Sequence, residues 1–174
     1  MSETRGVTVT YCERWNSTLH KPIGIMRADK AKIQHDAGSL YSIALGDPTR
    51  PDAFIEIRWE TNYLGVWFFD EKIRRSLKYT FERIDDKSLF LTEITSWEYP
   101  SSAQKDLSGA SIINTLCYSQ DGTVRHQKKD KAAGEVLTED HSGVDIHSNY
   151  EPVPQFGHWN SVARWNRELP PGKA

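Results

Sequence analysis

The densest pattern of hydrophobic and polar positions lies between residues 54 and 100. Four runs rich in β-branched and aromatic residues, at 54–59, 63–69, 73–84 and 89–99, are separated by short polar breaks. Runs of this length, joined by turns of this kind, are typical of strands in an antiparallel meander. The pattern therefore predicts four consecutive strands at the centre of the fold.

The second and third of these runs predict where the meander is buried. Residues 64–69 are apolar at almost every position, which is typical of a strand covered on both faces. Gly65 within that run indicates a bulge or a bend. Residues 73–84 alternate instead, with Leu77, Tyr79 and Phe81 on one face and charged or hydroxyl residues on the other. The apolar face of this strand should point inward.

Glu93 is the residue that fits the fourth run least well. It shares its parity with Leu89, Leu91 and Trp97, so a regular strand would place its carboxylate among apolar neighbours. Burial there would raise the carboxyl pKa, as a general acid requires. The alternative is a bulge that reverses the parity and exposes Glu93 to solvent.

The N-terminal third is less regular. Alternation over residues 6–15 predicts a first strand, and residues 40–45 predict another. Residues 27–38 fit one or two helical turns, whereas 32–35 fit a strand equally well. The sequence 36–39, Asp-Ala-Gly-Ser, predicts a turn that ends this region.

The C-terminal third predicts two hairpins and a last element. Strands over 110–119 and 123–130 should be joined by the Asp121-Gly122 turn. The basic end of the second strand would suit an exposed sheet edge. A second hairpin is predicted over 135–140 and 143–150, with a turn at 141–143. Apolar residues at helical spacing over 161–169, followed by two prolines, favour a short C-terminal helix. A last strand through Trp159 and Trp165 is the rival interpretation.

Nine or ten strands with short connections predict a mainly β protein of one domain over residues 1–174, with flexible tails at 1–5 and 170–174. Closing a long meander into a barrel hides its edges, and a barrel of about eight strands can hold one small ligand. We therefore expect an antiparallel β-barrel with a short C-terminal helix. A two-sheet sandwich remains open.

The expected barrel is similar in outline to the lipocalin-like barrels, and the resemblance is architectural. The glycine-Xaa-tryptophan signature expected near the N-terminus of lipocalins is missing. The nearest match, from Leu64 to Trp67, lies in the middle of the chain.

Composition limits the partners. The chain has 22 Lys and Arg against 24 Asp and Glu, so a net charge of −2 argues against a nucleic-acid binder. No apolar run reaches the roughly 20 residues of a membrane helix, and no signal peptide is visible, which favours a cytoplasmic protein. Cys12 and Cys117 should be buried free thiols, with a disulfide as the minority alternative.

The sequence contains few residues in patterns that indicate catalysis or ligand binding. No phosphate-binding loop, dinucleotide fingerprint or metalloprotease motif occurs, and we expect neither a cofactor nor a metal. On a strand, Asp145 and His147 would share one face and could form a metal site or an acid–base pair, or simply face solvent. With Glu93 they are the candidate catalytic residues. The candidate ligand-binding residues are Trp59, Trp67, Arg75, Tyr79, Trp97 and Tyr118.

Three functions fit this sequence. The first is a barrel that holds a small hydrophobic or aromatic molecule in an aromatic-lined cavity, oriented by Arg75 and Glu93. The second is a cofactor-free cyclase, isomerase or lyase that uses the same cavity, with Glu93 or His147 moving a proton. The third is an interaction or homodimerisation module whose exposed aromatics lie between Phe156 and Trp165.

Overall fold

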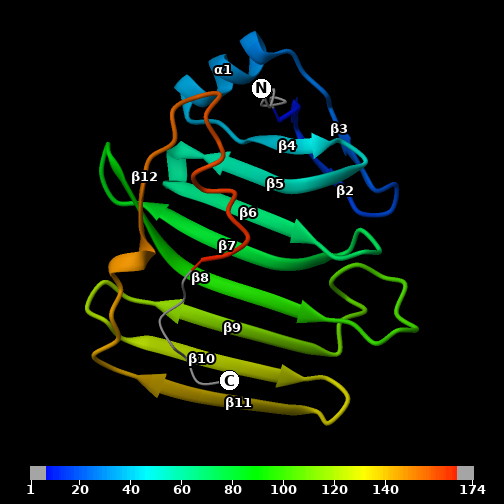
Figure 1. Ribbon diagram of the computed structural model, residues 1–174, viewed down its shortest axis with the longest axis vertical. Coiled ribbons are helices and arrows are strands. Elements are labelled where there is room, and N and C mark those ends of the chain that lie inside the picture. Colours follow the sequence, from blue (N-terminus) through cyan, green and yellow to red (C-terminus); the bar gives the residue numbers. More distant parts are fainter. Residues whose placement is uncertain (1–6, 168–174) are drawn as a thin grey trace, which may run out of the picture.

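A computed structural model describes residues 7–167 and shows one large antiparallel sheet (Figure 1). Each strand from β4 to β11 pairs with the next one along the chain, β1 pairs with β4, and β12 pairs with the start of β8. A separate small sheet holds β2 and β3. The strands are β1 Val9–Cys12, β2 Arg14–Asn16, β3 Lys21–Ile23, β4 Tyr41–Asp47, β5 Arg50–Arg58, β6 Tyr63–Phe69, β7 Arg75–Arg83, β8 Ser88–Glu98, β9 Ile112–Tyr118, β10 Val124–Asp130, β11 Glu135–His141 and β12 Tyr150–Pro152. The helices are α1 Ala28–Ala37 and the 3₁₀ turns η1 Trp59–Thr61 and η2 His147–Asn149.

The four runs of the predicted meander become β5, β6, β7 and β8, so the antiparallel meander is confirmed. The register is irregular at Phe68/Phe69 and at Thr80/Phe81 rather than at Gly65. The requirement for glycine at position 65 has a different cause. The hydroxyl of Tyr63 lies where a side chain at position 65 would begin, so only glycine lets that ring fold back over its own strand.

The sheet does not close, so the predicted barrel is wrong. Its two end strands are β1 and β11, and within residues 7–167 no strand joins them (Figure 1). The reason lies in β10 and β11. The positions that would face a barrel interior include His126, Lys128 and Glu139, and every residue of β11 is exposed. Without an apolar inner face, these strands have nothing to close around.

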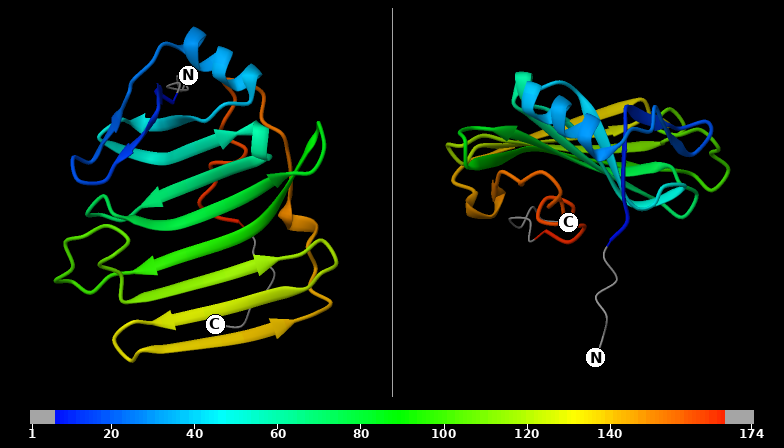
Figure 2. Two further views of the ribbon diagram at one scale, coloured as in Figure 1. Left: turned by 180° about the vertical axis from the view of Figure 1, so that it is seen from behind. Right: turned by 90° about the horizontal axis from the view of Figure 1, so that it is seen from above.

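One face of the sheet, which we call the core face, carries the hydrophobic core. A single row of opposed residues crosses it from β4 to β9: Ile43, Ile55, Val66, Tyr79, Ile94 and Leu116. The chain from 153 to 167, here called the strap, lies over this face (Figure 2). Trp159 and Val162 of the strap are buried in the same core cluster. Helix α1 lies at the β1–β4 end of the sheet and contributes the buried Ala31.

The predicted C-terminal helix is also wrong, because the helix of this protein is α1. Residues 161–167 form irregular chain, while 168 and 169, the end of the predicted helix, lie outside the described residues. Arginine side chains bind carbonyls that a helix would need for its own backbone. The Ser161 carbonyl accepts from Arg164 Nε at 3.0 Å, and the Val162 carbonyl accepts from Arg167 Nη2 at 3.1 Å. These bonds fix the irregular conformation of the strap.

The second predicted C-terminal hairpin is replaced by a different pairing. The turn at 131–134 joins β10 to β11, so the basic strand β10 is flanked on both sides and is not an edge. Residues 143–149 form a loop and η2 instead of a strand. The Asp121-Gly122 turn between β9 and β10 is confirmed. Both cysteines are free; Cys12 is buried as expected, whereas Cys117 is exposed.

Candidate functional site: the pocket beside α1

Three predicted ligand-binding residues lie together, but on the face opposite the core, which we call the outer face. The rings of Trp67 and Trp97 are 5.4 Å apart, and the Arg75 guanidinium lies 4.8 Å from the Trp67 ring. Arg75 is already held by Asp106, whose carboxylate accepts from its Nε at 2.8 Å. This cluster therefore packs the outer face of the sheet, where no closed cavity encloses it.

Glu93 belongs to the outer face as well. Thr80 pairs with Glu93 and Phe81 with Leu91, so Thr92 is an extra residue that reverses the parity of β8. Glu93 thus points away from Leu89 and Leu91 and accepts a hydrogen bond from Thr95 Oγ1 at 2.9 Å. The bulge of the alternative interpretation is present and reverses the parity, but Glu93 is half-buried rather than exposed.

The other candidate catalytic residues lie elsewhere. Asp145 and His147 do contact each other, with 2.7 Å between the carboxylate and Nδ1, but their side chains are 78% and 97% exposed. Asp145 lies in the loop that leads into η2, and His147 is the first residue of η2. The structure therefore brings Asp145 and His147 together and leaves Glu93 apart from them. Catalytic roles for these three residues stay predictions.

Tyr79 and Tyr118 lie in the core rather than around a cavity. Tyr79 donates its hydroxyl to the Trp165 carbonyl at 2.7 Å and so ties the strap to β7. Burial raises the pKa of Tyr118 to about 12, which keeps its phenol neutral at ordinary pH. Both rings are structural parts of the folded core.

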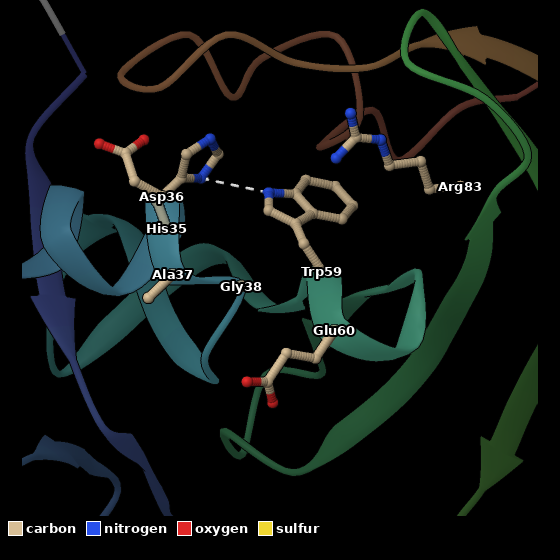
Figure 3. A pocket seen from close by; sticks show the side chains of 7 residues that line it. All are labelled: His35, Asp36, Ala37, Gly38, Trp59, Glu60 and Arg83. Carbon is tan, nitrogen blue, oxygen red and sulfur yellow. Dashed lines mark hydrogen bonds between the residues drawn. The ribbon is translucent and has the colours of Figure 1, made fainter.

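Trp59, the remaining predicted residue, lines a pocket of about 390 Å³ at the C-terminal end of α1 (Figure 3). The other residues that line the pocket are His35, Asp36, Ala37, Gly38, Glu60 and Arg83. They come from α1, η1 and the end of β7, which are far apart in the sequence. Of the predicted set, only Trp59 is found here.

Gly38 is the residue that brings α1 and η1 together. It ends the helix in the left-handed conformation, with φ of +75°, and its carbonyl accepts from the Glu60 N–H at 3.0 Å. A Cβ at this position would lie 3.0 Å from that same backbone nitrogen. Both the backbone angle and the close approach therefore require glycine, and the predicted turn at 36–39 is a helix C-cap.

A hydrogen-bond network fixes the inner wall of the pocket. The Trp59 indole N–H donates to His35 Nδ1 at 3.3 Å, and the Tyr41 hydroxyl lies 2.8 Å from the same nitrogen. Because an indole can only donate, Nδ1 must be an acceptor, which leaves the proton of the neutral imidazole on Nε2. His35 also meets the rings of Phe156 and Trp159 edge-on, so it joins the helix, the sheet and the strap.

Burial lowers the pKa of His35; nearby Asp36 opposes this shift, whereas the cations Lys32 and Arg83 lower the pKa further. The folded protein therefore binds this proton more weakly than the unfolded chain does. Stability from this site is fully present above the ordinary imidazole pKa of 6.5 and decreases as the pH falls below it. Protonation of Nδ1 would also turn a proton toward the Trp59 N–H.

We accordingly expect the urea midpoint of the wild type to drop between about pH 7.5 and about pH 5.5 more steeply than that of His35→Gln. Glutamine still offers an oxygen to Trp59 but does not titrate. Denaturation followed by circular dichroism at the two pH values measures this difference. Equal drops for both proteins would show that His35 does not contribute.

The charges around the pocket are paired except at one residue. The Asp36 carboxylate is bound by Lys32 at 2.6 Å, and Arg83 binds Asp86 at 3.0 Å while its guanidinium lies 5.3 Å from the Trp59 ring. Among the described residues, the Glu60 carboxylate has no ion pair and no hydrogen-bond donor. It lies beside the C-terminal end of α1, the negative end of the helix dipole.

Figure 3 shows how these groups are arranged. The Trp59 indole lies between the His35 imidazole and the Arg83 guanidinium, whereas the Glu60 carboxylate points away from both, past the end of α1. A flat aromatic wall and an unpaired carboxylate thus border the same pocket.

A second pocket of about 420 Å³ lies on the other side of η1, lined by Leu40, Glu56, Arg58, Thr61 and Tyr63. The carboxylate that lines this second pocket, that of Glu56, already accepts hydrogen bonds. Glu56 Oε2 accepts from the Trp67 indole N–H at 2.8 Å and from the Tyr63 hydroxyl at 3.1 Å. The pocket beside α1 is therefore the one of these two with an unengaged carboxylate.

Sequence reasoning missed His35 and Glu60. The only available signal was Gly38 after an ambiguous stretch, which suggests a helix end but not its neighbours. The contact between residues 35 and 59 depends on how β4 and β5 return the chain to the same end of the sheet. This contact is set by the tertiary structure and not by a local sequence pattern.

Comparisons with known proteins give no family. No family model matches the chain, and neither curated proteins nor solved structures show a significant similarity. Within residues 7–167, no group of three metal-binding side chains comes together, and no helix is long and apolar enough to span a membrane.

Proposed function

We propose that the protein binds a small organic molecule with a positively charged amine and a flat apolar part, in the pocket beside α1. The observation that carries this proposal is that the unpaired Glu60 carboxylate and the Trp59 indole line the same pocket. An ammonium group would neutralise Glu60, and the apolar part would lie against the indole.

The electrostatics of the pocket favour a cation over an anion. Arg83 and Asp36 are each matched by a partner, so Glu60 and the negative end of α1 provide the excess charge. The Arg83 guanidinium against Trp59 shows that this ring accommodates a cation. A carboxylate ligand would meet Glu60 and the helix end with the wrong sign.

This proposal keeps the first function expected from the sequence and moves its site. The ligand is small and partly aromatic, as expected, but the pocket is at the surface beside a helix instead of inside a barrel. A cyclase, isomerase or lyase activity remains a prediction, as does an interaction through the aromatic residues between Phe156 and Trp165.

The proposal is tested by isothermal titration calorimetry with two ligands of similar size and opposite charge, 2-phenylethylamine and 3-phenylpropanoate. We expect saturable binding of the amine and none of the carboxylate. Glu60→Gln should weaken amine binding by about tenfold, because a charge-assisted hydrogen bond contributes roughly 1.5–3 kcal/mol. Glu60 is exposed, so the substitution should leave the fold intact.

Glu71→Gln is the matched control, since Glu71 is another exposed glutamate, in the turn between β6 and β7. It should bind the amine as the wild type does. Absence of saturable amine binding would overturn the proposal. Equal affinities of Glu60→Gln and the wild type would show that the amine binds elsewhere.

A further inference from the structure

Within residues 7–167, no second layer covers β11, and in β9 and β10 only Tyr118 and Val124 are buried. The strap crosses the other half of the sheet, and β11 forms the outermost strand (Figures 1 and 2). All seven residues of β11 are exposed, with Val136 at 54% and Leu137 at 61%. Val136 and Leu137 are large apolar side chains that β11 leaves exposed, one on each face of the strand.

The outer edge of β11 is unpaired in the described part of the chain. The strand bonds to β10 on one side over its whole length, from Glu135 to His141. Its other side therefore presents a row of free backbone N–H and C=O groups. An edge of this length is a template for another strand.

We propose that two copies of this protein pair through β11, antiparallel, about a two-fold axis at Thr138. The register follows from symmetry. A two-fold axis perpendicular to the sheet places one residue opposite its own copy and pairs the others symmetrically around it. Centring on Thr138 pairs all seven residues of the strand.

Charge complementarity selects this centre. Around Thr138, Glu135 lies opposite His141 of the second copy, while Val136 and Leu137 lie opposite Asp140 and Glu139. No like charges face each other. Centring on Leu137 shortens the overlap to the five residues 135–139 and sets Glu135 against Glu139. Centring on Glu139 or Asp140 sets that carboxylate against itself.

The neighbouring strand β10 supports the same register. Lys128 lies beside Leu137 and Lys129 beside Val136. In the paired sheet, each lysine would stand in one row with Glu139 or Asp140 of the second copy, across an apolar side chain. Within its own chain, Asp140 is already bound by Arg125 at 2.8 Å, which offsets its charge before pairing.

Leu137 lies next to the axis, so pairing places the Leu137 side chains of the two copies diagonally across it, whereas Val136 points to the other face of the strand and lies opposite Asp140 of the second copy. The contact area is small, since it involves one strand from each copy and the rows beside it. We therefore expect a reversible dimer whose population depends on concentration.

Sedimentation velocity over a roughly hundredfold range of concentration tests the pairing. The wild type should shift from monomer to dimer. Thr138→Lys and Thr138→Glu should each be monomeric alone, because each places two like charges opposite one another at the axis. Mixed together, they should form a heterodimer, because lysine then faces glutamate.

This rescue depends on the register, because position 138 faces itself only when the axis passes through it. Thr18→Lys, at an exposed residue in the turn between β2 and β3, is the control and should dimerise as the wild type does. A wild type that stays monomeric overturns the proposal. So does a dimer that survives Thr138→Lys, or a mixture that stays monomeric, because both place any contact elsewhere.

Discussion

Glu151→Ala is expected to lower the free energy of unfolding by about 3–5 kcal/mol, because it leaves the Arg167 guanidinium buried without a counter-charge. The Arg167 and Glu151 side chains are 3% and 7% exposed, and Arg167 Nη1 donates to Glu151 Oε1 at 2.6 Å. Burial lowers the pKa of Arg167, and the Glu151 carboxylate is the main group that opposes this shift. Urea denaturation followed by circular dichroism measures the loss.

The position of Arg167 explains why the effect should be large. The guanidinium lies 4.9 Å from the Phe81 ring and 5.3 Å from the Tyr79 ring, under the strap and above the core face. Arg164 also contacts Glu151, but its side chain is 54% exposed and can turn to water. The Arg167 guanidinium cannot turn to solvent in this way while the strap stays in place.

Two variants separate the buried charge from the loss of packing. Glu151→Leu combined with Arg167→Met removes both charges and keeps apolar volume, so it should recover much of the stability lost in Glu151→Ala. Arg164→Gln should cost less than about 1 kcal/mol, as exposed ion pairs usually do. If the double variant were as unstable as Glu151→Ala, packing at position 151 would be the cause instead.

The meander was readable from sequence because its signal is local. Alternation in β7 and the continuous apolar run in β6 each arise from contacts between neighbouring strands, and adjacent strands are also neighbours in the chain. The Asp121-Gly122 turn was predictable for the same reason. The parity of β8 was not, because the bulge at Thr92 adds one residue without any residue type that marks it.

Closure of the sheet was not readable because it is a property of all the strands together. Counting strands suggested a barrel, yet β10 and β11 have polar residues on both faces. The strap takes over the covering role that the far wall of a barrel would have had. Its helical spacing of apolar residues was real, but arginine side chains bind the carbonyls of Ser161 and Val162.

The candidate site was predictable only in part. Trp59 was named for its ring, and the structure places it in a surface pocket beside the end of α1 instead of inside a barrel. Trp67, Arg75 and Trp97 were grouped correctly and assigned to the wrong face, since parity gives neighbours without saying which side is covered. Glu60 became a candidate only once its neighbours were known to be paired.

The strap also supports the pocket, because the rings of its Phe156 and Trp159 contact His35. Trp159 is 1% exposed and meets the rings of Tyr41 and Phe156 as well. The chain segment that closes the core is thus in direct contact with the residue that orients Trp59. Loosening the strap should therefore destabilise α1.

Trp159→Ala should therefore have two consequences. The free energy of unfolding should fall by about 3–5 kcal/mol, the usual cost of truncating a buried tryptophan. In native-state hydrogen exchange, amides of α1 should also lose protection, because His35 loses one of the rings that hold it. Chemical denaturation measures the first effect, and exchange resolved by residue measures the second.

Trp159→Phe is the matched control. The Trp159 indole N–H is buried and has no acceptor among the described residues, so phenylalanine removes an unsatisfied donor while keeping an aromatic ring. Its free energy of unfolding should fall by less than half as much as in Trp159→Ala, and the amides of α1 should stay protected from hydrogen exchange. If Trp159→Ala lowered stability while exchange in α1 stayed unchanged, the strap would stabilise the sheet without supporting the pocket. If the two variants lost equal stability, the indole would be contributing through something other than its ring contacts.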